Sequence, residues 1–345
     1  MKIYFLPKDK VKLLVESVLD EFQVFGAKAK EMKFEFGKID TAAELRLDYN
    51  TTILPPVKTF FPNDEKILEF KPNGQTTSVH ENSKKVLFGV HPCDIHAIEM
   101  MDNIFSTPPE DKHYLERRKD SIIIGINCNT PCSDKILCYD KGTYKADSGF
   151  DLMFWDNGES YLVEVVTSLG NFLASKFSYF FNFFTEYSGD FHEFKSEYHK
   201  RQDFVFEKKL TRKISELPEA MRQSYESELW HEVGAKCLSC GSCNIVCPTC
   251  YCFDVKDVVD IDLAGGHRCR NWDSCQNLDF ACVGSGENFR EKSSQRNRHR
   301  VFKKEVYLPQ NKGYSGCVGC GRCNTACIAG ISLIDIYNNV FSEEV

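Results

Sequence analysis

The chain has 345 residues, of which 42% are hydrophobic and 27% charged, and its formal net charge is -7. This length predicts two domains, and the apolar content is sufficient for buried cores. The acidic balance argues against nucleic acid as a partner, because phosphate binding relies on clustered Lys and Arg. No run of about 18 apolar residues and no signal peptide is visible, which predicts a cytoplasmic protein without a membrane partner.

Apolar periodicity predicts an α/β domain in the first two thirds of the chain. Helical spacing predicts helices over residues 11–22 and 94–105. Short β-branched or apolar runs predict strands over residues 84–90 and 121–126. Because a helix separates these two strands, we expect a βαβ unit with a parallel pair.

The next segments predict a hairpin and then a charged helical region. Strands are predicted over residues 151–155 and 161–166, with a turn at Asp156-Asn157-Gly158 between them. Residues 191–228 have a charged, helical pattern. We therefore place the boundary between domains near residue 225, so that they span residues 1–225 and 226–345.

Cysteine is the most informative residue type. There are 17 cysteines, and 13 of them lie between Cys237 and Cys327. A disulfide scaffold is disfavoured, because the chain is long, the count is odd and no secretion signal is visible. Many thiols in one segment of a cytosolic chain indicate a metal site instead.

Two cysteine runs share the pattern C-x2-C-G-x-C-N-x2-C, over residues 237–247 and 317–327. A [4Fe–4S] cluster needs one thiolate for each of four irons, and in the two-cluster ferredoxin pattern the fourth cysteine of each run binds the other cluster. The predicted ligands are Cys237, Cys240, Cys243 and Cys327 for the first cluster, and Cys317, Cys320, Cys323 and Cys247 for the second. Zinc is disfavoured, because zinc ribbons use paired C-x2-C motifs, whereas each run has a third evenly spaced cysteine and then a fourth. Full thiolate ligation leaves no open position for substrate, so we expect one-electron relay and no catalytic residues.

An insert over residues 248–316 separates the two runs. Its cysteines Cys250, Cys252 and Cys275 are either buried thiols beside the clusters or ligands of a further cluster. The stretch from Phe289 to Lys304 has seven basic residues against one acid. This stretch is either a docking patch or a surface that compensates the charge of the clusters, and we favour the second interpretation.

Several motifs together resemble one known family. They are Cys247-Pro-Thr-Cys250-Tyr-Cys252, Arg270-Asn-Trp272-Asp-Ser-Cys275, Glu287-Asn-Phe289-Arg290, the second cysteine run, and upstream Gly89-Val-His91-Pro-Cys93-Asp94. Over roughly residues 54–334 the chain resembles a family of 4Fe–4S dicluster proteins. This family holds the iron–sulfur subunit of anaerobic sulfite reductase and the beta subunit of sulfhydrogenases.

The resemblance implies an α/β N-terminal domain followed by a mainly helical, dicluster ferredoxin-like domain. It also implies a protein without a catalytic centre of its own, which relays electrons between two partners. One partner is a flavoprotein subunit that binds FAD and NAD(P)H. The other is a catalytic subunit, for which we favour a siroheme sulfite reductase over a nickel–iron hydrogenase. A stand-alone flavin and iron–sulfur oxidoreductase is a further alternative.

Four upstream cysteines raise the question of a third cluster. Cys93 and Cys128 each follow a predicted strand, and the carboxyl ends of parallel strands meet at one edge of a sheet. Cys132 and Cys138 follow in the next loop. Together the four would suit a third [4Fe–4S] cluster; ordinary buried thiols are the alternative. The family usually has Cys-Phe-Cys where this chain has Ile136-Leu137-Cys138, so Cys132 would have to replace one ligand.

Overall fold

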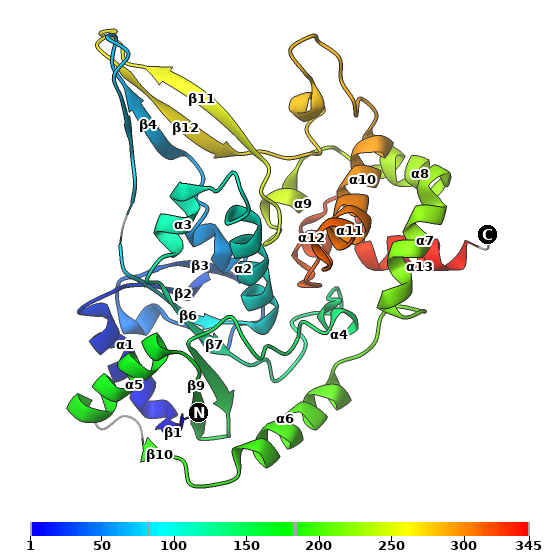
Figure 1. Ribbon diagram of the computed structural model, residues 1–345. Coiled ribbons are helices and arrows are strands. Elements are labelled where there is room, and N and C mark those ends of the chain that lie inside the picture. Colours follow the sequence, from blue (N-terminus) through cyan, green and yellow to red (C-terminus); the bar gives the residue numbers. More distant parts are fainter. Residues whose placement is uncertain (1, 82, 182–184, 344–345) are drawn as a thin grey trace. The chain divides into compact units, whose positions relative to one another are not determined.

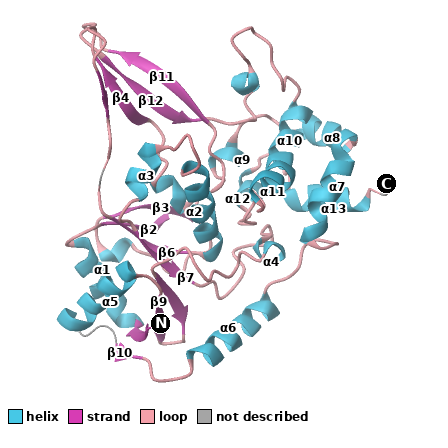
Figure 2. Cartoon of the chain, in the orientation of Figure 1, coloured by secondary structure: helices cyan, strands magenta, loops and turns pink. Residues whose placement is uncertain are grey.

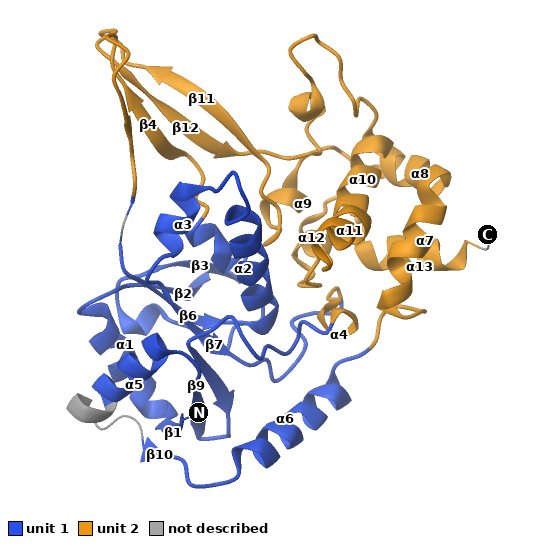
Figure 3. Cartoon of the chain, in the orientation of Figure 1, with its two compact units in different colours: residues 1–60, 81–134, 142–207 blue, residues 61–80, 135–141, 208–345 orange. Residues whose placement is uncertain are grey.

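The computed structural model describes residues 2–81, 83–181 and 185–343 (Figure 1). The chain forms two compact units (Figure 3). Unit 1 comprises residues 1–60, 81–134 and 142–207, and unit 2 comprises residues 61–80, 135–141 and 208–345. The predicted boundary near residue 225 divides the chain differently. Unit 2 begins earlier and takes in two short upstream segments, which a single cut in the sequence cannot represent.

Unit 1 is built on an eight-stranded sheet with a parallel centre. In sheet order its strands are β10 (Thr185–Glu186), β1 (Lys2–Pro7), β9 (Ser160–Val165), β8 (Leu152–Asp156), β7 (Ile122–Ile126), β6 (Lys85–Val90), β2 (Gln23–Lys30) and β3 (Lys33–Ile39). The four from β8 to β2 pair in parallel, and the outer pairs are antiparallel. The predicted strands β6 to β9 are present, and β6 pairs with β7 in parallel as expected.

Helices cover both faces of this sheet (Figure 2). They are α1 (Val11–Leu19), α2 (Pro92–Phe105), α3 (Lys112–Arg118), α5 (Ser168–Phe181) and α6 (Phe191–Val205). Side chains alternate between the faces of a strand. On β7, Ile122 and Ile124 share a core with residues of α1 and α5. The next residue, Gly125, faces the other side of the strand, and a Cβ added there would lie 2.9 Å from Cδ1 of Ile95, so α2 packs on that face.

Unit 2 contains α4 and the α-helices that follow α6. They are α4 (Cys138–Lys141), α7 (Leu217–Gln223), α8 (Leu229–Lys236), α9 (Ser242–Ile245), α10 (Ser293–Phe302), α11 (Leu308–Lys312), α12 (Arg322–Ala326) and α13 (Leu333–Ser342). A π-helical turn, Lys303–Tyr307, joins α10 to α11. Trp230, Phe302 and Tyr337 belong to one buried core that these helices share. Among the described residues, no helix is both long and apolar enough to cross a bilayer.

Unit 2 also contains an antiparallel sheet that the sequence patterns did not predict. Its order is β11 (Phe253–Val259), β12 (Gly266–Trp272), β4 (Glu65–Phe70) and β5 (Thr76–Ser78). The motif residue Arg270 on β12 donates from Nε to Oε2 of Glu65 on β4 at 2.9 Å, and both side chains are buried. Nε1 of Trp272 donates to the carbonyl of Phe61 at 2.9 Å. Part of the 248–316 insert is therefore a strand pair that anchors residues 61–80.

Candidate iron–sulfur site

The two cysteine runs fold into loops with matching backbone conformation. Ser239 and Gly241 have φ values of 53° and 74°, and their counterparts Gly319 and Gly321 have 68° and 73°. A short helix follows each loop, α9 after Gly241 and α12 after Gly321. In each loop the N–H two residues after the first cysteine donates to its Sγ at 3.4 Å. The internal repeat of the sequence is therefore a structural repeat.

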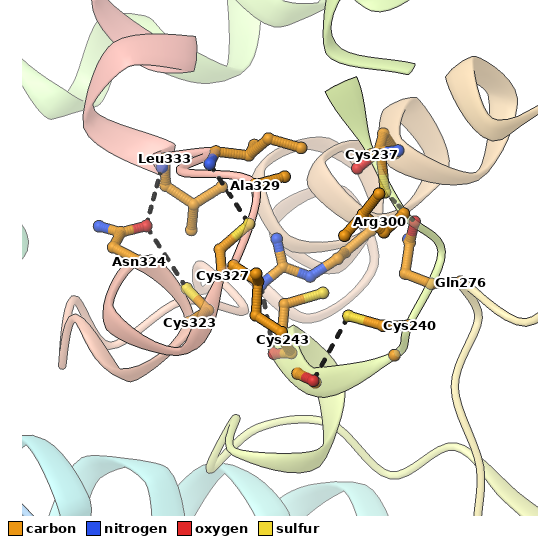
Figure 4. Close-up of a pocket in the computed structure, with 16 residues that line it drawn as sticks. Cys237, Cys240, Cys243, Gln276, Arg300, Cys323, Asn324, Cys327, Ala329 and Leu333 are labelled. Carbon is orange, nitrogen blue, oxygen red and sulfur yellow. Dashed lines mark hydrogen bonds between the residues drawn. The ribbon is translucent and has the colours of Figure 1, made fainter. Parts of the chain in front are cut away.

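The cysteines line two adjoining cavities. The first cavity is lined by Cys237, Cys240, Cys243 and Cys327, and the second by Cys247, Cys317, Cys320 and Cys323 (Figure 4 shows the first). The fourth cysteine of each run thus lies with the first three cysteines of the other run. Arg300, Cys323, Asn324 and Leu333 line both cavities, so the two cavities adjoin at these side chains.

Arg300 of α10 is a buried cation at the junction of the two cavities. Figure 4 shows its side chain reaching in among Cys237, Cys243 and Cys327. Its Nη2 lies 3.5 Å from the carbonyl oxygen of Cys243, and its buried Nε has no hydrogen-bond partner among the described residues. Burial lowers the pKa of Arg300, but the thiols of Cys243 and Cys323 outweigh it and hold the pKa well above its usual value. A buried cation with unused donors fits an anionic group, such as a thiolate-ligated cluster, in these cavities.

Lys304 is a second buried cation, and it lines the second cavity. Its Nζ donates to Cys247 Sγ at 3.3 Å, to Thr249 Oγ1 at 2.9 Å and to the carbonyl of Gly316 at 3.1 Å. A hydrogen bond from Cys250 lowers the pKa of Cys247, and Lys304 acts in the same direction, so this pKa lies well below its usual value. The structure therefore favours the thiolate form at Cys247, which is the form that binds metal.

A buried polar network lies next to Cys317, which lines the second cavity. Lys141 Nζ lies 2.7 Å from Glu305 Oε2, with both side chains almost fully buried. Tyr337 donates to the other carboxylate oxygen at 2.7 Å, and Ser315 Oγ bridges Glu305 and the N–H of Cys317. Residues 135–141 also contact the loop directly, because the N–H of Leu137 donates to the carbonyl of Gly319 at 2.7 Å.

Three cysteines of the insert, Cys250, Cys252 and Cys275, do not line either cavity. Cys250 hydrogen-bonds to Cys247, and Cys252 hydrogen-bonds to Cys275. Asn244 Nδ2, on the helix after the first loop, lies 3.0 Å from Cys275 Sγ. The structure therefore places these thiols next to Asn244 and Cys247 of the first cysteine run. Their role as metal ligands stays a prediction.

The upstream cysteines are divided between the two units. Cys93 is buried in the first turn of α2, which follows β6, and Cys128 follows β7. Both lie in unit 1 with Cys132, whereas Cys138 begins α4 in unit 2. No three His, Cys, Asp or Glu side chains in the described part of the chain form a group suited to a single metal ion. A third cluster stays a prediction.

Sequence reasoning missed the buried cations of the basic stretch. We expected a solvated surface between Phe289 and Lys304, but Arg296, Arg300 and Lys304 are all more than nine-tenths buried. These three residues are spaced four apart, which places them on one face of a helix. The spacing was a usable signal, whereas the partners of this face were not visible in the sequence.

The matched loops and paired cavities have the arrangement expected of an iron–sulfur protein. Residues 236–331 match a family described as "4Fe-4S dicluster domain". Over 318 residues the chain is 34% identical to "Sulfhydrogenase 2 subunit beta" of Pyrococcus furiosus, and the alignment covers 92% of each protein. The chain belongs to the family of this sulfhydrogenase beta subunit. No solved structure matches it significantly.

Proposed function

We propose that this chain is the iron–sulfur electron-transfer subunit of a hydrogenase-type complex. The observation that carries the proposal is the pair of adjoining cavities, each lined by cysteines drawn from both runs. When bound there, two [4Fe–4S] clusters supply one-electron redox chemistry. The chain's own residues hold the clusters next to each other, and Arg300 and Lys304 offset their negative charge.

The proposed ligands are those that the spacing predicts. Cys237, Cys240, Cys243 and Cys327 hold the first cluster, and Cys247, Cys317, Cys320 and Cys323 hold the second. The test is iron and sulfide analysis of the anaerobically purified chain, with electron paramagnetic resonance (EPR) of the dithionite-reduced protein. We expect about eight irons per chain and bleaching of the visible absorption on reduction. A colourless protein that contains only zinc would overturn the proposal.

The same analysis tests the third cluster. If Cys93, Cys128, Cys132 and Cys138 ligate a further [4Fe–4S] cluster, the iron content rises to about twelve per chain. A content of about eight that is unchanged by Cys93→Ala would refute this third site.

For the partners, the hydrogenase alternative is better supported than the sulfite reductase that the sequence patterns favoured. The relative's name identifies a sulfhydrogenase subunit, and the alignment covers nearly all of both proteins. We therefore propose a flavoprotein subunit that binds FAD and NAD(P)H on one side and a nickel–iron catalytic subunit on the other. Metal analysis of the native complex tests this choice, since nickel is expected and siroheme in its place would refute it.

A further inference from the structure

Two buried cations, Arg300 of α10 and Lys304 of the π-helical turn that follows it, line the two cavities differently. Arg300 lines both of them, whereas Lys304, one turn further along, lines only the second. Lys304 Nζ makes three hydrogen bonds, and two of its acceptors, Thr249 Oγ1 and the Gly316 carbonyl, are neutral oxygens. Its third partner is Cys247 Sγ. The sulfur of a proposed cluster ligand is therefore one of the three atoms to which this buried ammonium donates.

The fourth cysteine of the first cavity has a neutral hydrogen-bond donor instead of an ammonium. Cys327 Sγ accepts a hydrogen bond from the backbone N–H of Ile331 at 3.3 Å. Cys240 is exposed, and its Sγ lies 3.4 Å from the hydroxyl of Ser242. At the position where the first run has Thr249, the second run has Ala329, which has no hydroxyl to hold an ammonium.

Lys141 and Glu305 near the second cavity form an ion pair with each other. Of the charged side chains that line the cavities, Arg300 lines both and Lys304 lines only the second. Reduction of a cluster adds one negative charge without forming or breaking a bond, and a buried cation favours that reduced state because solvent screens it weakly.

We propose, on the basis of the two-cluster function above, that Lys304 selectively raises the reduction potential of the cluster held by Cys247, Cys317, Cys320 and Cys323. Lys304 is then a residue that directs the relay: it biases the electron toward the second cluster. Other features of each cavity also set the potential of its cluster, so the effect of Lys304 is measured as the change on its substitution.

The experiment compares Lys304→Met with the matched control Lys303→Met in the full-length, cluster-loaded protein. Both remove one positive charge from the same turn. The Lys303 ammonium lies 4.0 Å from the centre of the Tyr251 ring, and Lys303 does not line either cavity. Anaerobic redox titration followed by EPR gives a midpoint potential for each cluster. Ser242→Ala, next to Cys240, marks the signal of the first cluster.

We expect Lys304→Met to lower the equilibrium constant for reduction of the second cluster about tenfold, which is about 59 mV for one electron. The potential of the first cluster should change by less than about a third of that shift. Lys303→Met should change the potential of each cluster by less than the same limit. Unchanged potentials, or equal shifts of both clusters, would overturn the proposal.

A further pair of variants covers the case in which Lys304→Met loses iron. Lys304→Arg keeps the charge and should retain the wild-type potentials, whereas Lys304→Gln keeps only a neutral donor and should lower the second potential. The reverse pattern would refute a role for the charge. If the wild-type chain itself lacks two redox-active clusters, the proposed function fails rather than this inference.

Discussion

The first and second cysteine loops have the same backbone and different surroundings. Ser239 of the first loop accepts a hydrogen bond from Arg296 Nη2 at 2.9 Å, and the neighbouring Cys240 is exposed. The corresponding Gly319 of the second loop is covered by the backbone of Leu137, a segment about 180 residues earlier in the chain. A sequence repeat thus specifies a ligand loop, and distant segments decide the polarity and access of each copy.

The largest expected effect is the loss of one cluster when its fourth cysteine ligand is replaced. Because Cys327 lines the first cavity and Cys247 the second, Cys327→Ser should remove the first cluster and leave the second. The iron content should fall from about eight to about four. Cys247→Ser should do the reverse, and EPR of the two variants should show the two different remaining signals. Loss of the same signal in both variants would contradict this exchange of fourth ligands.

The buried ion pair beside the second cavity should be the next most sensitive feature. Lys141→Met leaves the Glu305 carboxylate buried without its cation, so we expect a loss of about 3–5 kcal/mol in the free energy of unfolding. Anaerobic urea titration followed by circular dichroism measures this loss. The double variant Lys141→Met/Glu305→Gln should recover part of it. As a control, Arg222→Met breaks the exposed Arg222–Glu219 pair and should cost less than about 1 kcal/mol.

The next prediction concerns Gly319, because the backbone of Leu137 and Cys138 approaches it closely. A Cβ at this position would lie 2.5 Å from the backbone nitrogen of Cys138, and φ is +68°. Gly319→Ala should therefore destabilise the protein by about 2–4 kcal/mol in the same urea titration. Gly330 has the same φ with open space around its Cβ. Gly330→Ala should cost about 1 kcal/mol, from the backbone conformation alone. Equal losses would mean that the covering segment does not constrain the loop.

The smallest expected effect concerns the exposed edge of the first cavity. Ser242→Ala removes a neutral hydroxyl 3.4 Å from Cys240 Sγ. Loss of one neutral hydrogen-bonding group near an exposed ligand should change the first cluster's reduction equilibrium by less than about tenfold, which is about 59 mV. Redox titration measures this change. If Ser242→Ala shifts the potential of the first cluster by more than Lys304→Met shifts that of the second, charged contacts do not affect the potential more than neutral ones, and the prediction is wrong.

The sequence alone determined the chemistry of the site. The two C-x2-C-G-x-C-N-x2-C runs predicted eight thiols in two sets of four, and the two cavities are lined by these sets. This was possible because ligand spacing and glycine placement are local properties of the chain. The strands β6 and β7 and the helix between them were also predicted correctly, since each has a clear local period.

Tertiary structure alone decided what surrounds the site. The sheet that joins residues 61–80 to β11 and β12, the cover of Leu137 over Gly319, and the burial of Arg300 and Lys304 all depend on segments far apart in the sequence. A basic run has the same composition whether it is solvated or buried against sulfur. The physical reason is that burial of a cation is favourable only where an anionic partner is brought to it, and that partner comes from elsewhere in the fold.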